Sequence, residues 1–188
     1  MKEISSTPDY QQLVSRIDEV YTEGQRRATQ AVNTHMVATY WAIGQYIVEF
    51  EQGGEARAEY GQALLKRLSQ DLQAKHGRGF SRSNLSHMRR LYLYFPKRET
   101  LSHKLSWSHY FELVKIDDEL ERGFYLQQTL RERWSIRELK RQKRTGLFQR
   151  LALSKDKAEV LRLAQEGQAL EKPQDLLRDP YVFEFLGL

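Results

Sequence analysis

The chain has 188 residues and a formal net charge of +5, and 40% of its residues are hydrophobic, a composition that excludes a disordered polypeptide. It contains no cysteine, which excludes a disulfide framework, a thiolate nucleophile and a thiolate metal site, and fits a reducing, cytoplasmic compartment. We expect no secretory signal and no membrane span, because no stretch approaches the roughly 18 apolar residues that a span needs.

Residues 1–54 are predicted to be amphipathic helix that serves as a scaffold or an oligomerisation surface. Apolar residues recur at helical spacing over residues 9–23 and again over residues 25–51. Gly24 is expected to be a weak point between the two stretches, and Gly53 begins the glycine pair that ends the second.

Residues 55–100 are predicted to form a helix-turn-helix. A helix over residues 56–75 is followed by a break at His76-Gly77-Arg78-Gly79, where glycine accepts the positive φ that such turns often need. Ser81 is the expected N-cap of a second helix, over residues 82–95, that ends before Pro96.

The second helix of this pair has two chemically different faces. Its inward stripe is predicted to consist of Leu85, Met88, Leu91, Tyr92 and Phe95, packed on the helix at 56–75. Arginine, asparagine and serine on the other faces suit phosphates or base edges in a DNA groove. The candidate DNA-binding residues here are Arg82, Ser83, Asn84, Ser86, His87 and Arg90. Plain packing of a helix hairpin is the alternative interpretation.

Residues 101–170 are predicted to form a second basic helical unit. Helices are expected over residues 107–116 and 117–133, the latter beginning with acidic side chains that suit a helix N-terminus. Ser135 to Glu138 reads "SIRE", a capping box that opens a helix to about residue 153, and a further helix is expected over 155–167. The exposed stripe of the helix that begins at "SIRE" is predicted to hold the candidate DNA-binding residues Arg137, Arg141 and Arg144, followed by Phe148. A protein interface on this stripe is the alternative.

The basic residues are concentrated in two blocks. Residues 61–115 hold 11 basic and 3 acidic side chains, and residues 135–157 hold 8 basic and 2 acidic ones. Separate basic blocks indicate local polyanion-binding surfaces, although solvated helix faces have the same composition.

Motifs of enzyme active sites are absent from the sequence, including Gly-rich phosphate loops, Gly-x-Ser-x-Gly and His-Glu-x-x-His. Glu138-Leu139-Lys140 spells the Glu-x-Lys of metal-dependent nucleases, with Asp117 and Asp118 about twenty residues upstream. Those nucleases carry the pair on strands, whereas the context here is helical. We therefore expect no catalytic residue, no metal and no cofactor in this chain.

Five ordered stretches together resemble the N-terminal domain of the YhcG family, bacterial proteins assigned to the PD-(D/E)XK nuclease superfamily. They are "YWAIGQYIVEFEQGGEARAEYG", "LSQDLQAKHGRGFSRSNLSHMRRLYLYFP", "LSWSHYFELV", "RGFYLQQTLRERWSIRELKRQ" and "DPYVFEFLGL". In that family a helical, winged-helix-like region precedes the nuclease domain. The resemblance implies a DNA-binding or targeting module, with the apolar tail at 171–188 as a linker to a C-terminal nuclease domain absent from these residues.

The sequence thus predicts an all-α helical bundle with winged-helix-like helix-turn-helix units. The expected partners are double-stranded DNA, further copies of the chain and the nuclease domain of the full-length protein. DNA and structured RNA are not distinguished. The alternative function is a protein-interaction or oligomerisation domain that positions the nuclease or a partner protein.

Overall fold

The computed structural model describes residues 8–53, 61–153 and 156–166. Those residues are helical throughout their regular structure and include no strand, which confirms the all-α prediction. They fall into two compact units, residues 1–114 and 115–188. Within the described ranges, no helix combines the length and apolar character that a membrane crossing requires. The predicted apolar tail at 171–188 lies outside the described residues.

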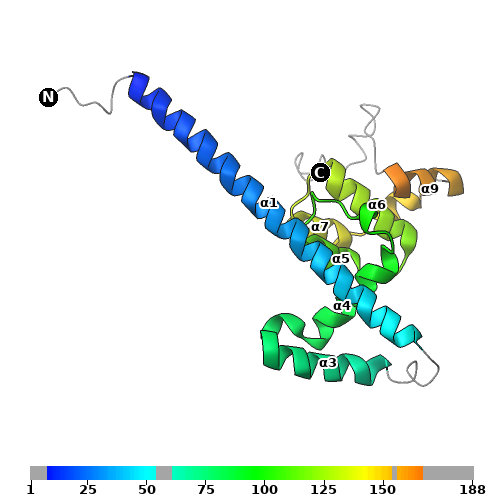
Figure 1. The fold of residues 1–188 in the computed structure, drawn as a ribbon. Helices are drawn as coiled ribbons and strands as arrows, with labels where there is room; N and C mark the ends of the chain where they lie inside the picture. Colours follow the sequence, from blue (N-terminus) through cyan, green and yellow to red (C-terminus); the bar gives the residue numbers. More distant parts are fainter. Residues whose placement is uncertain (1–7, 54–60, 154–155, 167–188) are drawn as a thin grey trace. The chain divides into compact units, whose positions relative to one another are not determined.

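The first unit is built on one long helix, α1 (Pro8–Gln52). The weak point predicted at Gly24 does not interrupt α1, which continues through it. A single glycine costs a helix only about 1 kcal/mol relative to alanine, which a long helix tolerates. In Figure 1, the N-terminal half of α1 extends past the other helices of its unit.

The described residues of the first unit also form α3 (Gly61–His76), α4 (Arg82–Tyr94) and α5 (Trp107–Leu113), with short 3-10 helices η2 (Arg78–Phe80) and η3 (Arg98–Thr100) between them. The core combines Ile47 of α1, Leu65 of α3, and Leu85 and Met88 of α4. The predicted inward stripe of α4 is confirmed, since Leu85, Met88 and Leu91 are fully buried.

The main partner of α4 is α1 rather than the helix at 56–75 alone, which corrects the prediction. A Cβ built on Gly44 of α1 would lie 2.0 Å from the Met88 carbonyl oxygen, so the two backbones approach closely at this point. The Trp41 indole N–H donates to the Phe95 carbonyl at 2.7 Å. Arg89 pairs with the half-buried Glu51 at 2.6 Å. These contacts hold the C-terminal half of α1 against α4.

The second unit contains α6 (Glu119–Arg131), α7 (Ile136–Arg144), α8 (Leu147–Ala152) and α9 (Lys157–Glu166). The acidic start of α6 is confirmed, because Asp118 accepts a hydrogen bond from the Glu121 N–H at 2.7 Å. At the other end, Arg133 has a φ of 52° and the Trp134 N–H reaches the Thr129 carbonyl, as in a Schellman helix end.

Candidate nucleic-acid interface

The turn before α4 is held by its own polar groups. Gly77 has the predicted positive φ, 83°. Ser81 is the predicted N-cap, and its hydroxyl accepts from the Asn84 N–H at 3.2 Å. The Asn84 side chain donates to the Gly79 carbonyl at 2.8 Å, so this candidate base reader also closes the turn. These local hydrogen bonds therefore fix the conformation of the turn that precedes α4.

The first turn of α4 presents basic and hydroxyl side chains outward. Arg82 and Ser83 are exposed and Ser86 is half-buried, while Leu85 of the same turn is fully buried. This opposition fixes which side of α4 faces the core. Arg78, exposed in η2 just before the helix, adds a cation that the sequence reasoning did not select. Its position in the glycine turn could have suggested it.

The other two candidate residues on α4 contact α5 and its C-terminal end. The His87 ring stacks on Phe111, with ring centroids 4.2 Å apart. An Arg90 guanidinium nitrogen donates to the Val114 carbonyl at 3.3 Å. The side chains of His87 and Arg90 are both half-buried. Arg82 and Ser83 are thus the more accessible candidates on α4, and His87 and Arg90 help to position the helix.

The candidate stripe on α7 begins from a capped helix start. The Ser135 hydroxyl accepts from the Glu138 N–H at 3.2 Å, as the "SIRE" motif predicts. Leu139 is fully buried, and Arg137 and Arg144 are exposed. Arg141 is half-buried and its Nε lies 3.1 Å from a Glu138 carboxylate oxygen. Of the three candidate arginines, the two exposed ones therefore lie at the ends of the helix, and Lys140 between them is exposed as well.

The prediction of one helix to residue 153 is wrong, and with it the exposed position of Phe148. Gly146 adopts the left-handed conformation, φ 65°, and separates α7 from α8. This break turns Phe148 into the core, where its ring lies 5.5 Å from that of Phe124. The buried Tyr125 hydroxyl joins the helices, accepting from the Phe148 N–H and donating to the Gln142 carbonyl.

Glu138 and Asp118, two of the acidic residues considered for a nuclease site, have structural partners. The Glu138 carboxylate accepts from Arg141 and, at 2.7 Å, from Gln142, while Asp118 caps α6. Among the residues that the structure describes, no group of three or more His, Asp or Glu side chains could hold a metal ion. The buried Arg122, which sequence reasoning did not single out, donates to the Ile116 and Asp117 carbonyls at 2.8 and 3.1 Å.

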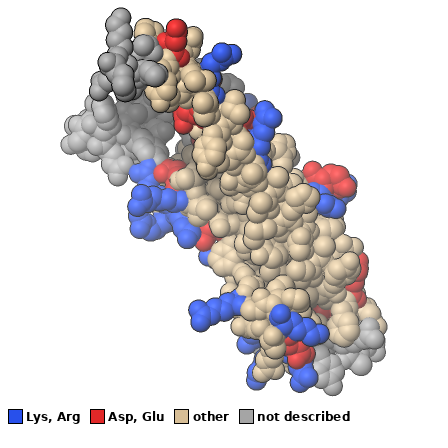
Figure 2. Space-filling view, turned by 60° about the vertical axis from the view of Figure 1, so that its left-hand side comes forward, with Lys and Arg blue, Asp and Glu red and all other residues tan. Residues whose placement is uncertain are grey.

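Charge on the face drawn in Figure 2 is grouped rather than continuous. On the face drawn in Figure 2, lysine and arginine side chains stand in several separate groups, and most of the area is neither acidic nor basic. Grouped cations suit contacts with individual phosphates more than adhesion over the whole surface.

Comparison with known proteins gives two matches. The profile of the DUF1016 N-terminal domain matches residues 16–150. The chain is 39% identical to a protein of Escherichia coli (strain K12) named "Putative nuclease YhcG", over 97% of this chain and 57% of that relative. The chain therefore spans little more than half the length of this relative. No solved structure matches. Since the domain profile covers well over half of its residues, the chain belongs to the DUF1016 N-terminal domain family, to which the resemblance to YhcG pointed.

Proposed function

We propose that this chain is the DNA-binding module of a YhcG-type nuclease, without catalytic residues of its own, and that it brings a nuclease domain to double-stranded DNA. The observation that carries the proposal is the first turn of α4. There, exposed Arg82 and Ser83 follow a capped, glycine-shaped turn, and Leu85 fixes the opposite side in the core.

Helix-turn-helix proteins place the N-terminal residues of the second helix against base edges. In this proposal, α3 and α4 are the two helices of a winged-helix-like unit. Arg82 is long enough to bridge guanine N7 and O6 or to pair with a phosphate, and the Ser83 hydroxyl suits a phosphate oxygen. The helix N-terminus adds partial positive charge at the same place.

The second basic helix supplies a further contact in this proposal. Arg137 near the start of α7 and Arg144 at its end are exposed, and the separation of seven residues between these positions corresponds to about 10 Å along the helix, enough to contact neighbouring phosphates of one strand. The α7 contact would then add affinity without reading bases.

The test is fluorescence anisotropy of the purified chain with a labelled DNA duplex over a salt series. We expect log K to fall linearly with log salt, with a slope of about 0.9 per phosphate neutralised. Arg137→Ala should lower that slope by about one on every duplex. Arg82→Ala should cost about 1–3 kcal/mol if it reads a base, and its loss should then depend on the duplex sequence.

Arg162→Ala is the matched control, because Arg162 is exposed and belongs to α9, outside both candidate helices. Thermal melting of each variant separates lost binding from lost folding. Absence of duplex binding at low salt would refute the proposal and favour the protein-interaction alternative. Preference for duplex RNA over DNA would change the partner while keeping the surface.

A further inference from the structure

The N-terminal half of α1 carries large apolar side chains in solvent. From Pro8 to Met36, every residue is exposed or half-buried. Ile17 is 60% exposed, Val20 76% and Tyr21 64%. Such exposure on one continuous helix is unusual, because a soluble helix normally buries its apolar stripe.

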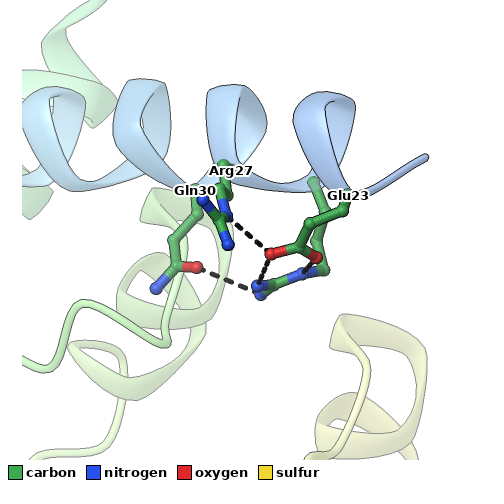
Figure 3. Close-up of polar contacts among 4 residues, drawn as sticks. Glu23, Arg27 and Gln30 are labelled. Atoms are coloured by element: carbon green, nitrogen blue, oxygen red, sulfur yellow. Dashed lines mark hydrogen bonds and ion pairs between the residues drawn. The ribbon is translucent and has the colours of Figure 1, made fainter. Parts of the chain in front are cut away.

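These side chains form one stripe. With a turn of about 100° per residue, they fall within about 120° of arc. The members of this stripe are Tyr10, Leu13, Val14, Ile17, Val20, Tyr21, Gly24, Ala28, Ala31, Val32 and His35. In this N-terminal half, the other side of the helix is polar: Figure 3 shows the side chains of Glu23, Arg27 and Gln30 in one hydrogen-bonded group, in which Arg27 lies 2.6 Å from Glu23. The pairing with arginine lowers the pKa of Glu23 to about 2.

The exposed stripe is not a continuation of the side that packs on α4. Val37, Gly44 and Val48 are buried, and the same rotation places them on the opposite side of α1 from the stripe. Tyr46, which is 69% exposed, falls on the stripe's side. The helix therefore has two apolar sides, and the fold of the first unit covers only one.

Residue size changes along the stripe. Its first half is bulky, up to Tyr21, and its second half contains Gly24, Ala28 and Ala31. A Cβ added to Gly24 would meet no atom within 4 Å, so nothing in the described fold requires glycine there. Small residues at helical spacing let the backbone of another helix approach closely.

We propose that this stripe pairs with the same stripe of a second copy, in antiparallel orientation, to form a two-stranded coiled coil. Val14, Ile17, Tyr21, Gly24, Ala28 and Ala31 alternate at spacings of three and four, as coiled-coil seams do. Antiparallel pairing places Val14 level with Ala31 of the other copy, Ile17 with Ala28, and Tyr21 with Gly24. Each bulky residue then faces a small one, and the interface is self-complementary, as two-fold symmetry requires.

Charge favours the antiparallel orientation over the parallel one. Residues 8–23 contain four acidic and one basic side chain, and residues 24–36 contain two basic and no acidic ones. Antiparallel copies therefore bring acidic segments level with basic segments, whereas parallel copies bring like charges together.

Length identifies the occupant as another α1. From Tyr10 to His35 the stripe extends about 38 Å, whereas a helix of 16 residues, the length of α3, covers about 24 Å. The other α-helices within the described ranges are shorter than α3. The apolar area on the stripe is on the order of 800 Å² per copy, the size of a standard stable interface.

The first test is sedimentation of the full chain without DNA. We expect a dimer that Ile17→Glu weakens at least about a hundredfold, because it would bury an unpaired charge from each copy. The matched control is Gln12→Glu, which adds the same charge on the polar side of α1 and should leave the dimer intact. A wild-type monomer, or equal weakening by both variants, would overturn the proposal. Circular dichroism and thermal melting show whether each variant stays folded.

The second test determines the relative orientation of the two α1 helices. Because the chain contains no native cysteine, any disulfide that forms must join the introduced cysteines. We expect Val14→Cys chains mixed with Ala31→Cys chains to oxidise to a disulfide-linked dimer, because antiparallel pairing brings these positions together. Either variant alone should not, since its two cysteines would be about 25 Å apart and a disulfide needs Cα atoms within about 7 Å. Efficient cross-linking of each variant by itself would indicate a parallel pair and overturn the antiparallel assignment.

Discussion

Replacing Gly44 by alanine tests the contact on which the first unit is built. The new Cβ would lie 2.0 Å from the Met88 carbonyl oxygen, 2.8 Å from its carbonyl carbon and 3.2 Å from the Tyr92 Cβ. The two nearest atoms belong to backbone and cannot rotate away, so α1 and α4 must separate. That movement also strains the hydrogen bond from Trp41 to Phe95.

The magnitude combines two opposing effects. Alanine stabilises a helix by about 1 kcal/mol relative to glycine, and overpacking costs about 1–3 kcal/mol, more when backbone must move. We expect a net loss of about 2 kcal/mol in the free energy of unfolding of the first unit, or about 1 M in the urea midpoint. Tryptophan fluorescence in a Trp134→Phe background follows this unit through Trp41 and Trp107.

Gly24→Ala is the control, measured at a protein concentration at which the chain is monomeric, because it makes the same substitution in the same helix where the added Cβ meets no atom of the chain within 4 Å. We expect it to leave the urea midpoint unchanged or to raise it. If Gly44→Ala is as stable as the wild type, α1 and α4 do not approach at this point, and the reasoning from close backbone contact is refuted.

Two further predictions concern backbone conformation and pH. Arg133→Gly should stabilise the second unit by about 1 kcal/mol in urea titration, because glycine adopts the positive φ of this position without the cost that arginine has. Burial raises the pKa of Tyr110 from 10.0 to about 12, so its contribution to stability is complete below pH 10 and is lost as the pH rises to 12. Urea midpoints of the first unit should therefore fall over this range, and less steeply in Tyr110→Phe; an equal slope in the variant would contradict the assignment.

Local signals in the sequence predicted the helix starts well. Ser81 and Ser135 each cap the helix expected after them, because a cap requires only residues within the same turn. Asp118, expected in the acidic first turn of its helix, is the N-cap of α6. The apolar spacing of Leu85, Met88 and Leu91 likewise predicted the buried side of α4, since helix geometry alone sets that side.

Features that depend on distant residues were not predictable in the same way. The partner of α4 is selected by Gly44, some forty residues earlier, and apolar spacing does not say which helix lies opposite. The break at Gly146 had a local signal, but the periodic arginines before it and Phe148 after it fall on one helical stripe, which favoured a continuous helix. The hydrogen bonds from Asn84 to Gly79 and from Arg90 to Val114 depend on how the turn and α5 pack against α4. A helical projection of α4 alone contains neither partner, so it predicts only that these two side chains point away from the core.

If the chain pairs through α1 and binds DNA through α4, as proposed above, the length of α1 sets the spacing of the two DNA sites. In an antiparallel pair centred between residues 22 and 23, the two Gly44 positions, each backing one α4, lie about 65 Å apart. Two turns of B-DNA span about 68 Å. The proposed dimer would place its two α4 helices at inverted half-sites whose centres lie about two turns apart on one side of the duplex.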